Sequence, residues 1–81
     1  MRKVLKVFWV DDYNGNPLRL ELRRDGDLYR WYCQENDENN IPTGPCTKDT
    51  EVSSPRYTWA LCDAEIVWGR WWNLRTKKRR Q

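Results

Sequence analysis

The chain has 81 residues and a mass of 9.9 kDa, which is enough for one domain around one small core. It contains no histidine, and this excludes a Ser-His-Asp triad, a Cys-His pair and any His-ligated zinc or haem. The net charge of +3 is unevenly placed, because residues 75–81 carry +5 and the remainder of the chain sums to −2.

The first predicted element is a β-strand over residues 3–10, which are dense in β-branched and aromatic residues. Successive side chains of a strand point to opposite faces, so Leu5, Val7 and Trp9 share one face. We expect these three residues to face the core, although the strand is apolar on both sides. The residues on the other face are Val4, Lys6, Phe8 and Val10.

Two further strands are predicted over residues 18–24 and 28–34. In the first of them, leucines alternate with charged residues, which is the period-two pattern of a half-buried strand. Short turn sequences such as Asp25-Gly26 connect the three strands and favour an antiparallel meander. The side chains expected to face the core are Leu18, Leu20, Leu22, Tyr29, Trp31 and Cys33.

Residues 35–50 are predicted to form a long loop, because Asn, Asp, Gly, Pro and Thr predominate there and Ile41 is isolated. A short edge strand over Thr47–Ser53 is the alternative for the last part of this segment. The acidic residues of the loop are candidates for binding a hard cation or a basic partner. Their spacing matches no calcium loop, so a solvated loop is the favoured interpretation. These acidic residues are Glu35, Asp37 and Glu38.

The C-terminal part of the chain predicts a helix that begins at Ser54-Pro55 or at Thr58. At 100° per residue, its apolar side chains fall in a sector of roughly 160°, the wide stripe of a helix that lies on a sheet. The side chains in this sector are Tyr57, Ala60, Leu61, Ala64, Val67, Trp68, Trp71, Trp72 and Leu74.

These elements predict an α+β fold in the order β-β-β-(β)-α, with a three- or four-stranded antiparallel meander sheet packed on one C-terminal helix. Residues 1–74 are expected to form the single domain, and residues 75–81 a basic tail. Such a tail attracts phosphate backbones with a strong salt dependence, and a solvated chain end is the alternative. Its charged residues are Arg75, Lys77, Lys78, Arg79 and Arg80.

The sheet face opposite the helix is predicted to display arginines between aromatic residues, with Glu21 among them. A face of this kind can contact phosphates, base edges or unstacked bases. The order of elements broadly resembles the arm-type DNA-binding modules of integrases, which implies a sheet that reads DNA and a helix that braces it from behind. An ordinary solvated face with alternating charges is the alternative. The candidate nucleic-acid-binding residues on this face are Phe8, Arg19, Arg23, Arg30 and Tyr32.

A second apolar stripe is predicted on the outer side of the helix. Trp59, Cys62 and Ile66 lie at positions i, i+3 and i+7, nearly opposite the core-facing stripe. The long loop around Ile41 is one candidate cover for this stripe. Otherwise the stripe is a protein-binding surface for a target protein or for a second copy of the chain.

The three cysteines form no C-x-x-C pair, and their odd number favours reduced thiols and a cytoplasmic protein. Cys33 and Cys62 are expected to act as small buried hydrophobic side chains. No catalytic triad, metal cluster, cofactor loop or substrate pocket is recognisable, so we expect a non-enzymatic binding module without cofactor, metal or membrane partner. Nucleic acid, DNA above all, is the leading partner. A phage-type or mobile-element-type inhibitor or adaptor that acts on a host protein complex is the alternative.

Overall fold

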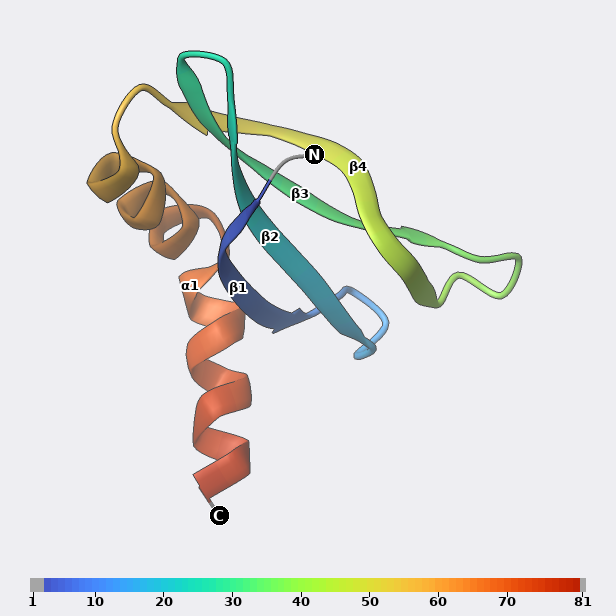
Figure 1. The fold of residues 1–81 in the computed structure, drawn as a ribbon. Helices are drawn as coiled ribbons and strands as arrows, with labels where there is room; N and C mark the ends of the chain where they lie inside the picture. Colours follow the sequence, from blue (N-terminus) through green and yellow to red (C-terminus); the bar gives the residue numbers. More distant parts are fainter. Residues whose placement is uncertain (1–2, 81) are drawn as a thin grey trace.

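Within residues 3–80, the chain folds into four strands followed by one helix: β1 (Val4–Asp11), β2 (Pro17–Asp25), β3 (Leu28–Asn36), β4 (Pro42–Ser54) and α1 (Tyr57–Arg80). The computed structural model describes the backbone of residues 3–80 and the side chains of residues 3–68. The strands form one antiparallel sheet in the order β1-β2-β3-β4. The helix lies against one face of the sheet, and its C-terminal part projects beyond it (Figure 1). This arrangement confirms the predicted α+β meander packed on a helix.

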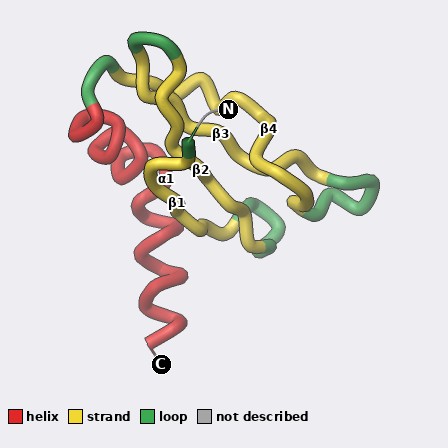
Figure 2. Tube along the Cα trace, viewed as in Figure 1, coloured by secondary structure: helices red, strands yellow, loops and turns green. Residues whose placement is uncertain are grey.

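The edge strand β4 contains the short strand over Thr47–Ser53 that was the alternative interpretation, and that alternative is confirmed. The strand begins earlier, at Pro42, and so occupies most of the segment predicted as a loop. Only residues 37–41 remain as a connection between β3 and β4, at one end of the sheet (Figure 2). Glycine and proline are depleted in strands, so the composition of this segment concealed it. Pro42 and Pro45 are tolerated because β4 lies at the edge of the sheet, where the missing N–H groups disrupt no central ladder.

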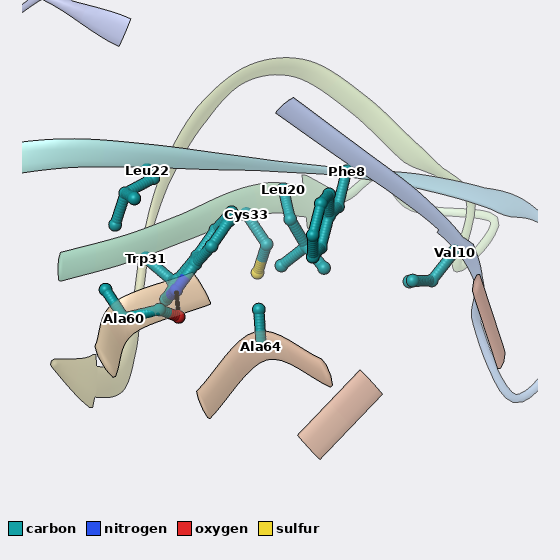
Figure 3. Close-up of a cluster of buried hydrophobic side chains, with 8 residues drawn as sticks. All are labelled: Phe8, Val10, Leu20, Leu22, Trp31, Cys33, Ala60 and Ala64. Carbon is teal, nitrogen blue, oxygen red and sulfur yellow. Dashed lines mark hydrogen bonds between the residues drawn. The ribbon is translucent and has the colours of Figure 1, made fainter. Parts of the chain in front are cut away.

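The core lies between the sheet and the first part of α1 (Figure 3). Trp31 on β3 is at its centre and is fully buried. Its ring stacks on Phe8 at a centroid distance of 5.2 Å and meets the edge of Trp68 at 5.9 Å. The small side chains of Ala60 and Ala64 are also fully buried, which allows α1 to approach the sheet closely. The remaining buried members of this cluster are Val10, Leu20, Leu22 and Cys33.

The expectation for β1 was wrong, because Phe8 and Val10, and not Val7 and Trp9, face the helix. The register pairs Phe8 with Leu20 and Trp9 with Arg19, so Phe8 shares the face of the buried leucines. An irregularity between Val4 and Lys6 shifts the register at the start of the strand, and Leu5 packs against the core as expected. The only charged residue among residues 4–10, Lys6, alternates with Phe8 and Val10, so it made the inner face look like the polar one.

The described part of the helix follows its predicted stripe only in part. Leu61 and Trp68 pack against the core beside the two alanines, whereas Tyr57 and Val67 are 37% and 49% exposed. The expectations for Trp71, Trp72 and Leu74 fall outside the described side chains. Among the described residues, no helix is long and apolar enough to cross a lipid bilayer.

Candidate nucleic-acid interface

The outer face of the sheet, meaning the face opposite α1, carries the arginines that the alternation of β2 and β3 predicts. Arg19, Glu21 and Arg23 follow one another along β2, and Arg30 and Tyr32 lie beside them on β3. Phe8 does not join this face, because it is buried in the core on the other side. The remaining four predicted contact residues on the sheet are therefore brought together as expected.

Glu21 is at the centre of this face and is 7% exposed. Its carboxylate accepts a hydrogen bond from Nε of Arg19 at 2.7 Å and another from Nη2 of Arg23 at 2.6 Å. Burial raises the pKa of Glu21, but the hydrogen bonds and charges of Arg23 and Arg19 outweigh it and hold the pKa below its ordinary value. Glu21 is therefore ionised at neutral pH and compensates part of the positive charge of both arginines.

Arg30 is paired with carboxylates in the same way. Its Nη1 lies 3.1 Å from Oδ2 of Asp49, and its Nε lies 3.5 Å from Oδ2 of Asp25. The hydroxyl of Tyr32 donates a hydrogen bond to Asp25 at 2.9 Å, and the guanidinium of Arg23 stands 5.0 Å from the centre of the Tyr32 ring. The outer face is thus a connected network in which three arginines meet three carboxylates.

Strand β4 adds a further contact to this network. The backbone carbonyl of Cys46 accepts a hydrogen bond from Arg23 at 3.0 Å, and the Cys46 thiol donates to the carbonyl of Arg19 at 3.3 Å. Cys46 is fully buried. Burial and the neighbouring charge of Glu21 raise the pKa of its thiol to about 11. No sequence pattern indicated that this cysteine is buried against the arginine network.

Two arginines that the sequence did not single out behave differently. Arg24, on β2, stands 5.3 Å from the centre of the Tyr29 ring, and Arg56 stands 5.0 Å from the centre of the Trp59 ring. In the described part of the chain, neither guanidinium has a carboxylate within 4.0 Å. The adjacent Arg23-Arg24 pair and the three-residue spacing of Arg56 and Trp59 are the only sequence signals that point to them.

No protein family, curated protein or solved structure matches this chain. The resemblance to arm-type DNA-binding modules therefore remains a prediction from the order of elements.

The outer stripe of α1 is exposed. The side chains of Trp59 and Ile66 are 53% and 81% exposed, and Cys62 is exposed as well. The expectation that Cys62 is a buried side chain was therefore wrong, whereas Cys33 is buried as expected. The loop around Ile41 does not cover the stripe, because it lies at the end of the sheet away from α1 (Figure 1).

Two of the three acidic residues predicted to lie in the loop, Asp37 in the β3–β4 connection and Glu35 on β3, have local structural partners. One Asp37 oxygen accepts hydrogen bonds from the backbone N–H groups of Asn39 at 2.8 Å and Ile41 at 3.0 Å, so this side chain closes the turn. Glu35 accepts a hydrogen bond from the Thr47 hydroxyl at 3.0 Å. Among the described residues, no group of three or more Cys, Asp or Glu side chains is arranged to hold a metal ion.

The predicted basic tail continues the backbone of α1, which extends to Arg80. Its charged side chains fall outside the described ones. The sequence itself adds one point about this arm, because residues 66–81 contain no Asp or Glu.

Proposed function

We propose that the protein is a non-enzymatic nucleic-acid-binding module. The observation that carries the proposal is the distribution of charge over the fold. The arginines of the outer sheet face are paired with carboxylates, whereas the basic residues 75–80 lie on a helical arm that has no acidic residue in its own sequence. The excess positive charge is therefore concentrated on the part of α1 that projects from the sheet (Figure 1).

A projecting cationic arm is suited to a polyanion. Each phosphate that it neutralises releases condensed counterions, so affinity falls steeply as salt rises. The five cationic residues after Leu74 set an upper limit on this contribution, a slope of about 3.5 for a single strand and about 4.5 for a duplex in log affinity against log salt. The sheet arginines are expected to contribute less, because each would have to leave a carboxylate partner before it bound a phosphate.

The proposal is tested with fluorescein-labelled oligonucleotides and fluorescence anisotropy at several salt concentrations. A variant with all five cations of residues 75–80 changed to Gln keeps the length of the chain and removes the charge. We expect weaker binding and a shallower salt slope for this variant. Absence of binding by the unmodified protein at low salt would refute the proposed function. An unchanged salt slope in the Gln variant would show that the basic arm does not contribute to nucleic-acid binding.

The exposed stripe of α1 favours a second candidate, a protein-binding inhibitor or adaptor. Trp59 and Ile66 lie on the same side of the helix, and large exposed side chains of this kind are enriched at binding hot spots. Affinity capture from host extract, with and without nuclease, separates the two candidates. Changing Trp59 and Ile66 to Ser should abolish nuclease-resistant capture of a protein. The control is Ile41→Ser on the remote loop, where the side chain is 44% exposed.

A further inference from the structure

The described arginines fall into two groups that differ in their partners. Arg19, Arg23 and Arg30 are held by carboxylates on the outer sheet face. Arg24 and Arg56 also stand over aromatic rings, as Arg19 and Arg23 do, but no carboxylate of the described residues lies within 4.0 Å of either. A guanidinium over a ring keeps its charge and most of its N–H donors available to a ligand.

Arg24 belongs to a continuous set of contacts that joins the end of β2 to the start of α1. Its Nη1 donates to the Tyr29 hydroxyl at 3.4 Å, and its guanidinium stands over the same ring. The Tyr29 ring in turn meets the Tyr57 ring edge-on, with 5.8 Å between the ring centres. Tyr57 is the first residue of α1 and is 37% exposed.

Arg56 and Trp59 form a second pair at the start of α1. Trp59 is two positions after Tyr57, about 200° further round the helix, so the two groups flank the helix start on different sides. Arg56 directly precedes Tyr57, and its guanidinium stands 5.0 Å from the centre of the Trp59 ring, which is 53% exposed. We name these five side chains the arginine–aromatic surface: Arg24, Tyr29, Arg56, Tyr57 and Trp59. It lies at the N-terminal end of α1, at the opposite end of the helix from the basic arm (Figure 1).

We infer that the arginine–aromatic surface binds single-stranded nucleic acid and is a second contact site in addition to the basic arm, an inference that rests on the proposed function. Single strands present unstacked bases, which stack on exposed aromatic rings, and phosphates, which pair with guanidinium groups. In a duplex the faces of the bases are already stacked on one another. The surface therefore prefers a single strand to a duplex of the same length.

The arginine–aromatic surface and the basic arm lie at opposite ends of the same helix, α1. The helix has 24 residues and bends between the part that lies on the sheet and the part that projects from it (Figure 1). The arginine–aromatic surface is at its start and the basic residues are at its end. A strand that follows the helix reaches both. The basic arm then provides salt-dependent attraction to any nucleic acid, and the aromatic rings provide a preference for single strands that salt weakens less.

The test compares a fluorescein-labelled oligothymidine of 15 nucleotides with a labelled 15-base-pair duplex, both titrated with the full chain. Two variants remove the stacking surface while retaining the basic arm: Trp59→Ala with Tyr57→Ala, and Arg24→Gln with Arg56→Gln. Two controls change one exposed aromatic residue and one exposed cationic residue elsewhere: Tyr13→Ala, where the side chain is 97% exposed in the unmodified protein, and Lys48→Gln on β4. Circular dichroism and thermal unfolding establish that each variant is folded.

We expect the Trp59 and Tyr57 double variant to bind the single strand about tenfold more weakly, because each stacked base contributes a factor of that order. Its affinity for the duplex should change less than twofold, and both controls should match the unmodified protein. A further variant, Arg24→Lys with Arg56→Lys, keeps the charge but loses the planar group, and we expect it to fall between the unmodified protein and the Gln variant.

The outcomes that overturn this inference differ from the one that overturns the proposed function. If the unmodified protein binds both probes and the double variants leave single-strand affinity unchanged, the surface is not the site. Equal losses for the single strand and the duplex would show that the surface does not select unstacked bases. If the unmodified protein binds neither probe at low salt, the proposed function itself fails.

Discussion

The indole Nε1–H of Trp31 donates a hydrogen bond to the backbone carbonyl of Ala60 across the interface between the sheet and the helix, with 2.9 Å between nitrogen and oxygen. Both residues are fully buried. This bond satisfies the single polar atom of a tryptophan at the centre of the core. It also fixes the position of the first turns of α1, and therefore that of Tyr57 and Trp59, relative to β3.

Trp31→Phe removes this hydrogen bond and leaves a cavity beside Ala60. We expect the free energy of unfolding to fall by about 2–3 kcal/mol, which combines the lost hydrogen bond with the lost packing. Thermal unfolding should show a midpoint lower by roughly 10–20 °C for a chain of this size. The matched control is Trp59→Phe at an exposed position, where a change within about 0.5 kcal/mol is expected. Similar losses at the two positions would contradict the assigned core.

The register of β1 makes a second prediction, because it assigns opposite roles to two neighbouring aromatic residues. Phe8 is buried against Trp31, so Phe8→Ala should cost about 3–4 kcal/mol in urea unfolding. Trp9 is half-buried on the outer face, where the Arg19 guanidinium lies 5.8 Å from the centre of its ring. Trp9→Ala should therefore cost only about 1 kcal/mol. A larger loss at Trp9 than at Phe8 would restore the face assignment expected from the sequence.

These two residues show how far the sequence determines the fold. On β2 the alternation of leucine with charged residues leaves one possible inner face, and Leu20 and Leu22 are buried as predicted. On β1 both faces are apolar, so the pattern cannot distinguish Phe8 from Trp9, and the pairing with β2 decides. The sequence specifies an element well where polar residues mark the solvent side.

The candidate site shows a different limit. Residue alternation placed Arg30 on the outer face, but it could not show that Asp49 neutralises it, because the sequence predicted no register between the possible edge strand over Thr47–Ser53 and β3. The pairing of Arg19 and Arg23 with Glu21 is a contact between positions two apart on one strand. It was visible in the sequence as three charged residues on one face, but its strength depends on the burial of Glu21, which only the fold supplies.

Glu21 gives a prediction about acid stability. Its pKa is lower in the folded chain than the ordinary value of 4.5, so the unfolded chain binds the proton more readily. The contribution of Glu21 to stability is therefore fully present above about pH 4.5 and is lost as pH falls through the lower folded-state pKa. Urea unfolding at a series of pH values from 7 to 3 should show this loss.

The matched variant is Glu21→Gln, which keeps the shape and removes the charge. At neutral pH it leaves two partly buried arginines without their shared carboxylate, and we expect a loss of about 2 kcal/mol. The difference in unfolding free energy between the variant and the unmodified protein should shrink as pH falls below about 4.5, because the unmodified protein loses the same charge. A difference that stays constant down to pH 3 would show that the ion pairs contribute nothing to stability.

The three cysteines should react with a thiol reagent at distinct rates, because the fold places them in different surroundings. Cys62 is exposed on α1, whereas Cys33 and Cys46 are buried. Burial raises the pKa of both buried thiols, that of Cys46 to about 11, so at pH 8 only about one Cys46 in a thousand is the reactive thiolate. With a chromogenic disulfide reagent at pH 8, we expect one thiol to react rapidly in the native protein and all three in urea. Cys62→Ser should abolish the rapid phase and leave stability unchanged. Rapid reaction of a second thiol in that variant would contradict the burial of Cys33 or Cys46.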